Sequence, residues 1–199
     1  MKKRLLTALA ISVVVFGMLT TSRAKATTLT FDDVTTGNVA YPLQSVAPNY
    51  GGLTWSNYWG VTKGTNYPGS GYENGVVSGE YVAYYGSHPV TITGATFDFD
   101  GTYLTSSWLD SLNILVEGYA GGNLLYSQTV QTLKSQPTWF DFNYTGVNEL
   151  KFFADNNNNF AMDNFTFNHS NPVPEPATML LFGTGIAGLA ATRIRRKKK

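Results

Sequence analysis

The 27 residues at the C-terminus limit what this chain can fold into, because they join a Pro-Glu-Pro motif, an apolar segment and a basic tail. The apolar segment, residues 177–192, carries no charge. As a helix it would reach about 24 Å at roughly 1.5 Å per residue, against about 30 Å for the bilayer core. It can span a membrane if Arg193, Arg195 and Arg196 extend to the far surface. We therefore expect a single membrane helix here.

The basic tail predicts the orientation of that helix. Six of the last seven residues are Lys or Arg. Basic flanks of membrane helices stay on the cytoplasmic side. Everything before Pro174 is then expected to lie outside the inner membrane.

The residues Val173, Pro174, Glu175 and Pro176, followed by the apolar helix and the Arg/Lys tail, resemble the sorting signal of the PEP-CTERM proteins of Gram-negative bacteria. The resemblance implies that exosortase, a membrane-embedded cysteine peptidase, recognises the tail and cuts near the motif. The protein would be anchored transiently in the inner membrane and then reach the cell surface or the extracellular space. A setting of exopolysaccharide and biofilm production is also implied. An ordinary C-terminal membrane anchor is the alternative.

The N-terminus independently predicts export. Lys2, Lys3 and Arg4 precede an apolar stretch at residues 5–19, and Ala24-Lys25-Ala26 fits the A-x-A pattern cut by signal peptidase. A retained N-terminal anchor is the alternative. We expect a signal peptide at residues 1–26, one domain at 27–170, and a linker with the sorting signal at 171–199.

The exported part of the chain is strongly acidic. Residues 27–172 contain 12 Asp or Glu and only three basic residues, Lys63, Lys134 and Lys151, a net charge of −9. Such a surface repels phosphate backbones and anionic lipid, so a nucleic-acid partner is not expected. Neutral ligands or divalent cations are favoured.

The exported domain is predicted to be all-β, an antiparallel β-sandwich and most plausibly a jelly roll. It has no cysteine and no long helical periodicity, but many short runs of β-branched and aromatic residues. Gly121-Gly122 predicts a two-residue hairpin turn. Residues 60–75 are predicted to form one long loop, where ligands are often held. The expected strands are residues 28–34, 53–59, 76–85, 91–99, 112–119, 123–132, 139–144, 149–154 and 160–168.

Several short segments of the exported domain also resemble known sequences. They are similar to a β-sandwich module common in PEP-CTERM proteins, which resembles galactose-binding-like and carbohydrate-binding jelly rolls. This resemblance brings no established activity with it. The segments are residues 52–57, 97–99, 103–105, 118–119 and 161–165.

Acidic residues on the first and last predicted strands suggest a calcium site. Asp32 and Asp33 would meet Asp163 and Asn164 if the terminal strands are neighbours. Calcium takes six to eight oxygen ligands from carboxylates, amides and carbonyls. The alternative is that these side chains end strands and accept hydrogen bonds from backbone amides.

Aromatic residues near the predicted loop suggest a carbohydrate-binding site, because the C–H faces of sugars stack on aromatic rings. Strand alternation puts Trp55 and Trp59 on one face and Tyr58 on the other, so one tryptophan is expected in the core. In the alternative interpretation these aromatics all fill the sandwich. The candidate sugar-binding residues are Trp59, Asn66, Tyr67, Tyr72 and Glu73.

An enzyme is the second functional class. Asp98 with Asp100, or Asp110 with Glu117, could form the paired carboxylates of a glycoside hydrolase. Twelve acids in one domain make such pairs inevitable, and no multi-histidine zinc site or Ser/His/Asp set emerges. The sequence therefore favours an exported polysaccharide-binding or structural protein over a carbohydrate-active hydrolase or lyase.

Overall fold

The computed structural model describes residues 26–34, 44–45, 49–85 and 89–169. The predicted sorting signal and all of the predicted signal peptide except Ala26 lie outside these residues. Within the described ranges, no helix is long and apolar enough to cross a membrane.

The described part of the chain is almost entirely β-structure, with four helices of one turn or less. The strands are β1 (Thr27–Leu29), β2 (Gln44–Ser45), β3 (Thr54–Trp55), β4 (Trp59–Lys63), β5 (Tyr81–Tyr85), β6 (Val90–Ser106), β7 (Ser111–Ala120), β8 (Asn123–Leu133), β9 (Thr138–Ala154) and β10 (Phe160–His169). The helices are η1 (Tyr50–Gly52), η2 (Gly64–Asn66), α2 (Gly71–Asn74) and η3 (Asp155–Asn157).

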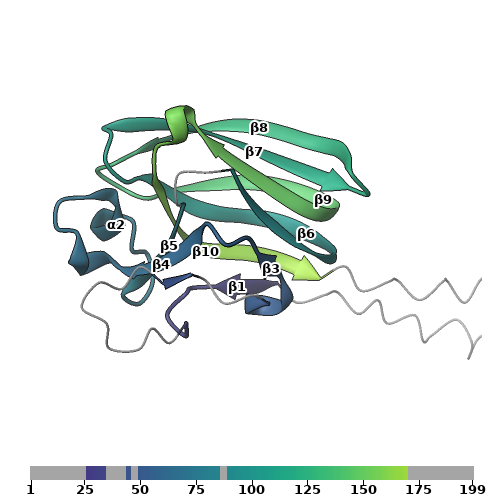
Figure 1. Ribbon diagram of the computed structural model, residues 1–199, viewed down its shortest axis with the longest axis horizontal. Helices are drawn as coiled ribbons and strands as arrows, with labels where there is room; N and C mark the ends of the chain where they lie inside the picture. Colours follow the sequence, from purple (N-terminus) through teal and green to yellow (C-terminus); the bar gives the residue numbers. More distant parts are fainter. Residues whose placement is uncertain (1–25, 35–43, 46–48, 86–88, 170–199) are drawn as a thin grey trace, which may run out of the picture.

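All strand pairs are antiparallel, and the strands join in one sheet in the order β2-β4-β5-β10-β6-β9-β7-β8, with β1 on β10 and β3 on β6. Figure 1 shows β7 and β8 on one side of the molecule and β1 and β3 on the other. The prediction of an all-β antiparallel fold is confirmed. The jelly-roll arrangement remains a prediction.

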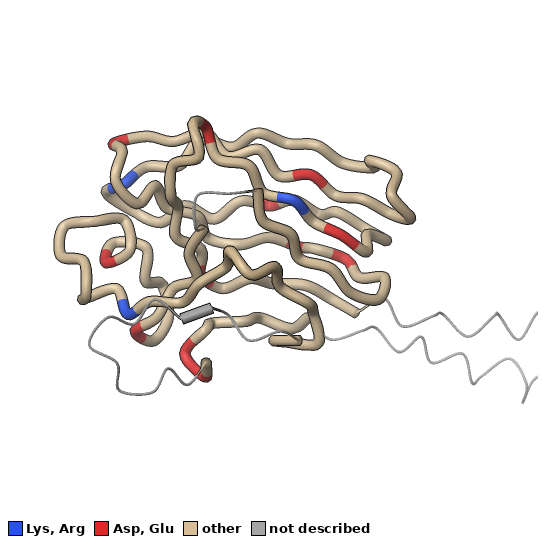
Figure 2. The backbone as a smooth tube through the Cα atoms, viewed as in Figure 1, with Lys and Arg blue, Asp and Glu red and all other residues tan. Residues whose placement is uncertain are grey.

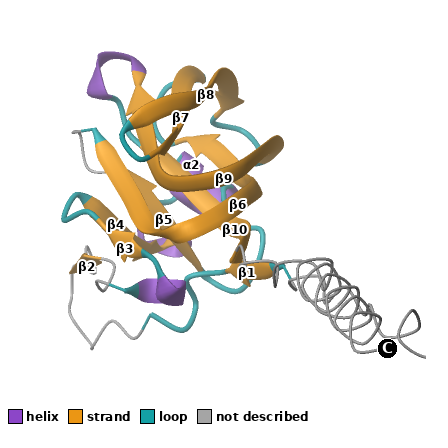
Figure 3. Cartoon of the chain, turned by 90° about the vertical axis from the view of Figure 1, so that its right-hand side faces the viewer, coloured by secondary structure: helices purple, strands orange, loops and turns teal. Residues whose placement is uncertain are grey.

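The sheet curls around its own apolar face. Strands β4 and β9 are four places apart in the sheet, yet the rings of Trp59 on β4 and Phe152 on β9 are 5.5 Å apart. The 17-residue strand β6 allows this curvature, because its pairing with β9 shifts register between Thr93 and Gly101. The turned view in Figure 3 shows β7 and β8 above β4 and β5.

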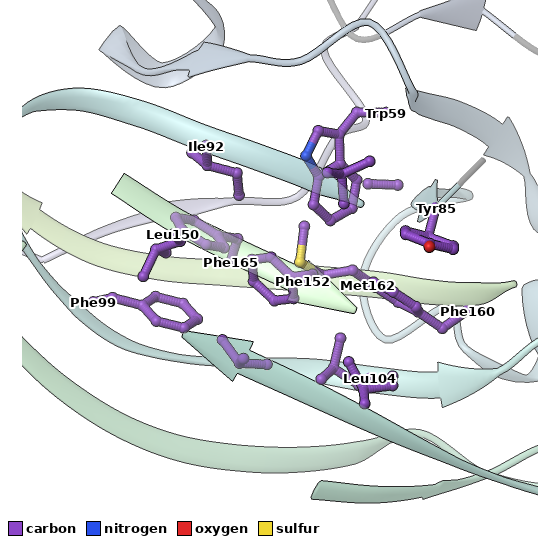
Figure 4. Close-up of a cluster of buried hydrophobic side chains, with 14 of the residues drawn as sticks. Trp59, Tyr85, Ile92, Phe99, Leu104, Leu150, Phe152, Phe160, Met162 and Phe165 are labelled. Carbon is purple, nitrogen blue, oxygen red and sulfur yellow. The ribbon is translucent and has the colours of Figure 1, made fainter. Parts of the chain in front are cut away.

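The core between the two sides of the curled sheet is aromatic. Phe99 stacks on Phe165 at 4.7 Å and on Phe142 at 5.0 Å between ring centroids. Figure 4 shows Trp59, Phe152 and Met162 directed into the same cluster. Without disulfides among the described residues, burial of these side chains is the main stabilising contribution.

Several predicted boundaries were wrong. The first strand ends at Leu29 because Phe31 has a positive φ of 64° and turns the chain. The predicted strands 139–144 and 149–154 are parts of the single strand β9, and the predicted loop 60–75 begins with β4. The hairpin is confirmed: Gly121 and Gly122 have φ values of 56° and 81°.

Candidate functional site

Trp59 lies in the core, so its prediction as a sugar-binding residue is wrong. Its side chain is only 1% exposed. The indole Nε1 donates to the carbonyl oxygen of Thr91 at 3.2 Å, and the ring packs edge-on against Trp55 at 5.4 Å. A ring enclosed in this way has no face to offer a ligand.

Tyr72 is also buried, although it lies in the predicted loop. It belongs to the short helix α2, whose first turn is capped by Ser70 Oγ accepting from Tyr72 N at 3.1 Å. The ring is 4% exposed and contacts Tyr84 on β5 at 6.0 Å. Burial raises the pKa of the Tyr72 phenol, whose oxygen accepts a hydrogen bond from Asn159 Nδ2 at 3.1 Å. Tyr72 is therefore a buried residue against which neighbouring aromatic rings pack.

The exposed ring beside Tyr72 is Trp108, which the sequence reasoning missed. Trp108 lies in the turn between β6 and β7 and is 51% exposed. Its ring meets Tyr72 at 5.5 Å and Tyr67 at 5.9 Å, both in edge-on geometry, and Tyr67 and Tyr72 are 5.2 Å apart. We call Tyr67, Tyr72 and Trp108 the loop aromatic patch. The signal that could have identified it is a tryptophan between Ser107 and Leu109, outside all predicted strands.

Three hydrogen bonds between loops hold this patch in place. The amide of Gly71 donates to Ser107 O at 2.8 Å, and Ser107 N donates to Asn159 O at 3.1 Å. The side chain of Asn74 donates to Lys134 O at 2.9 Å in the β8–β9 turn. A Cβ at Gly71 would lie 1.8 Å from the carbonyl oxygen of Ser106, so glycine is required for this close approach.

The two polar candidates of the predicted site lie on the same segment. Asn66 ends η2 and Glu73 lies in α2, and both are exposed. Glu73 Oε2 accepts a hydrogen bond from the amide of Gly69 at 2.7 Å, which steadies the loop. The structure thus brings Asn66, Tyr67, Tyr72 and Glu73 onto one segment, residues 64–75, but leaves Trp59 out.

The four predicted calcium ligands all accept hydrogen bonds, Asp32 and Asp163 from backbone amides and Asp33 and Asn164 from hydroxyl groups. Asp163 is buried, and its Oδ2 accepts hydrogen bonds from the amides of Val77 at 2.7 Å and Ser78 at 2.9 Å. Its Oδ1 accepts from Asn164 N at 2.7 Å, and Asn164 Oδ1 accepts from Ser78 Oγ at 2.7 Å. Burial, reinforced by the charge of Asp32, raises the pKa of Asp163 to about 6 despite these donors.

Asp32 and Asp33 lie in the turn after β1 and also accept hydrogen bonds. Asp32 Oδ1 accepts from the amides of Glu80 at 2.7 Å and Tyr81 at 3.2 Å, and Asp33 Oδ1 accepts from the Tyr50 hydroxyl. The described residues contain no group of three or more His, Asp or Glu placed to hold a metal ion. A calcium site at Asp32, Asp33, Asp163 and Asn164 remains a hypothesis.

The carboxylates considered for catalysis also make structural contacts. Asp98 Oδ1 accepts from Gly146 N at 2.7 Å, and both oxygens of Asp100 accept from Asn168 Nδ2, at 3.1 and 2.9 Å. Burial raises the pKa of Asp100. Glu117 accepts from the Tyr119 hydroxyl at 2.7 Å. Asp110 pairs with Lys134 at 3.1 Å.

The lysines leave most of the negative charge uncompensated. Lys63 pairs with Glu80 at 2.7 Å and Lys151 with Glu149 at 3.6 Å, as Lys134 does with Asp110. Figure 2 shows acidic positions distributed over the whole molecule and few basic ones. The domain as a whole therefore suits uncharged ligands better than anionic ones.

Solved structures with related shapes include TmCBM61 in complex with β-1,4-galactotriose, at 12% identity and a TM-score of 0.36, covering 59% of this chain and 88% of that one. The CBM22-1–CBM22-2 tandem domain from Paenibacillus barcinonensis Xyn10C matches at 13% identity and a TM-score of 0.40. That match covers 77% of this chain and 47% of the other, so this chain spans about half of its length. At this level of similarity neither structure identifies a ligand for this chain.

A comparison with curated protein sequences gave no match. A comparison with protein families matched residues 172–197 to the PEP-CTERM protein-sorting motif. The matched residues contain the Pro-Glu-Pro motif, the apolar segment and all but the end of the basic tail. The chain is therefore a protein that carries a PEP-CTERM sorting motif, which marks it for export.

Proposed function

We propose that the β-sandwich domain of this chain binds an uncharged polysaccharide outside the cell through the loop aromatic patch. The observation that carries the proposal is Trp108, an indole 51% exposed and fixed edge-on by two tyrosines at the end of a rigid sheet. Binding residues are often found on loops that a rigid scaffold positions.

The contacts of Trp108 prepare it for stacking. Because Tyr67 and Tyr72 both meet its ring edge-on, little side-chain freedom is left to lose when a ligand binds. The apolar C–H face of a sugar can then cover the exposed indole. Glu73 and Asn66 supply exposed carboxylate and amide groups that can hydrogen-bond the hydroxyls of a sugar.

The sorting motif supports an activity in the cell envelope. We propose that exosortase of a Gram-negative bacterium cuts near Pro174-Glu175-Pro176 after transient anchoring in the inner membrane, as the family resemblance implies. The ligand would then be a polysaccharide of the cell surface or of a biofilm matrix. A purely structural role in the matrix, without stacking on Trp108, is the competing form of the proposal.

Affinity electrophoresis tests the proposal directly. The full-length chain, in a neutral detergent, would be run in native gels containing galactan, xylan, mannan or mixed-linkage β-glucan. We expect retardation by at least one of these neutral polymers, and roughly tenfold weaker binding by Trp108→Ala, equivalent to about 1.4 kcal/mol.

The matched control is Tyr58→Ala, because Tyr58 is 49% exposed and lies in the β3–β4 turn. It should migrate as the wild type does in every gel. Equal retardation of the wild type and a folded Trp108→Ala chain, or no retardation of the wild type in any gel, would overturn the proposed function.

A further inference from the structure

A second aromatic pair lies outside the loop aromatic patch. Tyr103 on β6 and Trp139 on β9 are directly paired in the sheet, and their rings are 5.2 Å apart in edge-on geometry. Both side chains are half-buried, so part of each ring reaches solvent. Neither residue belongs to the aromatic core.

Trp139 is held in a defined orientation. A Cβ at Gly101 would lie 2.6 Å from the indole atom Cζ2, which shows that the ring lies over the backbone of Gly101. The indole Nε1 donates to Asp141 Oδ1 at 2.7 Å. The indole is therefore fixed over β6, and its half-buried ring leaves part of its surface open to solvent.

This pair lies on the same face of the sheet as the loop aromatic patch. A Cβ at Gly75, at the end of α2, would lie 2.9 Å from the Thr105 hydroxyl, so α2 covers Thr105. Tyr103 is two residues from Thr105 on β6 and therefore points to the same face. Its sheet partner Trp139 does so too.

The spacing along β6 fits several sugar units. Tyr103 and Trp108 are five residues apart, and a strand advances about 3.3 Å per residue, so their backbones are at most about 17 Å apart. An aromatic ring at each end of such a span can contact different sugar units of one polysaccharide.

We propose that Trp139, supported by Tyr103, is a second stacking position, and that the ligand is an extended polysaccharide chain running across this face from Trp108 to Trp139. This inference rests on the proposed function and adds a ligand class to it: internal segments of a long chain, and not chain ends or short oligosaccharides.

Dependence on ligand length tests the inference. Whichever of galactan, xylan, mannan or β-glucan retards the wild type would be partially hydrolysed, and its trimers and octamers titrated calorimetrically. We expect Trp139→Ala to bind octamers roughly tenfold more weakly and trimers as the wild type does. Trp139→Phe should recover part of the loss, whereas Trp108→Ala should weaken the binding of both lengths.

The outcomes separate the two proposals. If folded Trp139→Ala binds octamers as tightly as the wild type while Trp108→Ala does not, the second stacking position is wrong and the proposed function stands. If no polymer binds the wild type, or if neither variant differs from it, both proposals fail. Tyr58→Ala serves as the control for loss of an exposed aromatic elsewhere.

Discussion

Asp163 on β10 fixes the backbone of Val77, 86 positions earlier in the chain, through a hydrogen bond of 2.7 Å from Val77 N to Asp163 Oδ2. The carboxylate thereby ties the segment between α2 and β5 to the centre of the sheet. Burial raises the pKa of Asp163 from 3.8 to about 6 despite this hydrogen bond, so the Asp163 carboxyl also makes stability depend on pH.

The sign of that dependence follows from the direction of the shift. Asp163 binds a proton more tightly in the folded chain than in the unfolded one, so its contribution to the free energy of unfolding falls as pH rises from about 4 to about 6. The fall is on the order of 3 kcal/mol, at about 1.4 kcal/mol per pKa unit.

Asp163→Asn removes this titration. Urea unfolding at pH 4 and pH 7 should show the wild type losing stability relative to the Asn variant as pH rises. Other carboxylates titrate in both proteins, so the difference between them isolates Asp163. A difference that stays constant over this range would contradict the raised pKa.

Calcium should leave the melting temperature unchanged. The two oxygens of Asp163 and Oδ1 of Asp32 already accept backbone N–H groups, and a cation would have to displace these donors. Thermal melts of the full chain in calcium and in chelator decide between the hypotheses. Saturating calcium at 100 times its dissociation constant would add about 2.7 kcal/mol, and such a shift, lost in Asp163→Ala, would restore the metal site.

Two tryptophan truncations should differ sharply in their effect on stability. Trp59→Ala empties a fully enclosed position in the core and should cost on the order of 3–5 kcal/mol. Trp108→Ala removes a half-exposed ring and should change stability by within about 0.5 kcal/mol. Chemical unfolding of both variants checks this. Equal losses would mean that Trp108 is a packing residue, and the loop aromatic patch would no longer be a credible site.

Processing of the tail is open to mass spectrometry. In a host with an active exosortase, the mature protein should lack residues after the Pro174-Glu175-Pro176 motif and should begin at Thr27. Recovery only of chains that still end at Lys199 would leave a simple membrane anchor in place of a sorting signal.

The strands were predictable where periodicity or turn chemistry is strong. The glycine pair at 121–122 located the β7–β8 hairpin. Trp55 and Trp59 pack together and Tyr58 is exposed, as expected, but a turn between β3 and β4 separates the two tryptophans, so strand alternation is not the reason. Which of the two tryptophans would be exposed was not predictable from alternation, because the curled sheet buries both. Knowing on which face of a strand a residue lies does not show whether other parts of the folded sheet cover that face.

The candidate site was predictable only in part. Residues 60–75 were predicted to form one loop because glycine and asparagine are frequent there, and the prediction fails at its start, where β4 lies. Trp108 was missed because a turn has no periodicity, and its partners Tyr67 and Tyr72 are about 40 positions away in the sequence. The hydrogen bond from Gly71 N to Ser107 O and the ring contacts of Trp108 join the two segments only in the folded chain.

The pairing of β1 with β10 determines at which end of the domain the two ends of the described chain lie. Thr27 lies opposite Phe167, so the first and last strands of the described domain share one end of the sheet, and Figure 1 shows α2 at the other. Trp108 adjoins that far end, since Ser106 pairs with Phe160 at the start of β10. The ten residues of β10 put about 30 Å between the two ends. The loop aromatic patch therefore lies at the end of the domain opposite the strand end from which the tail continues.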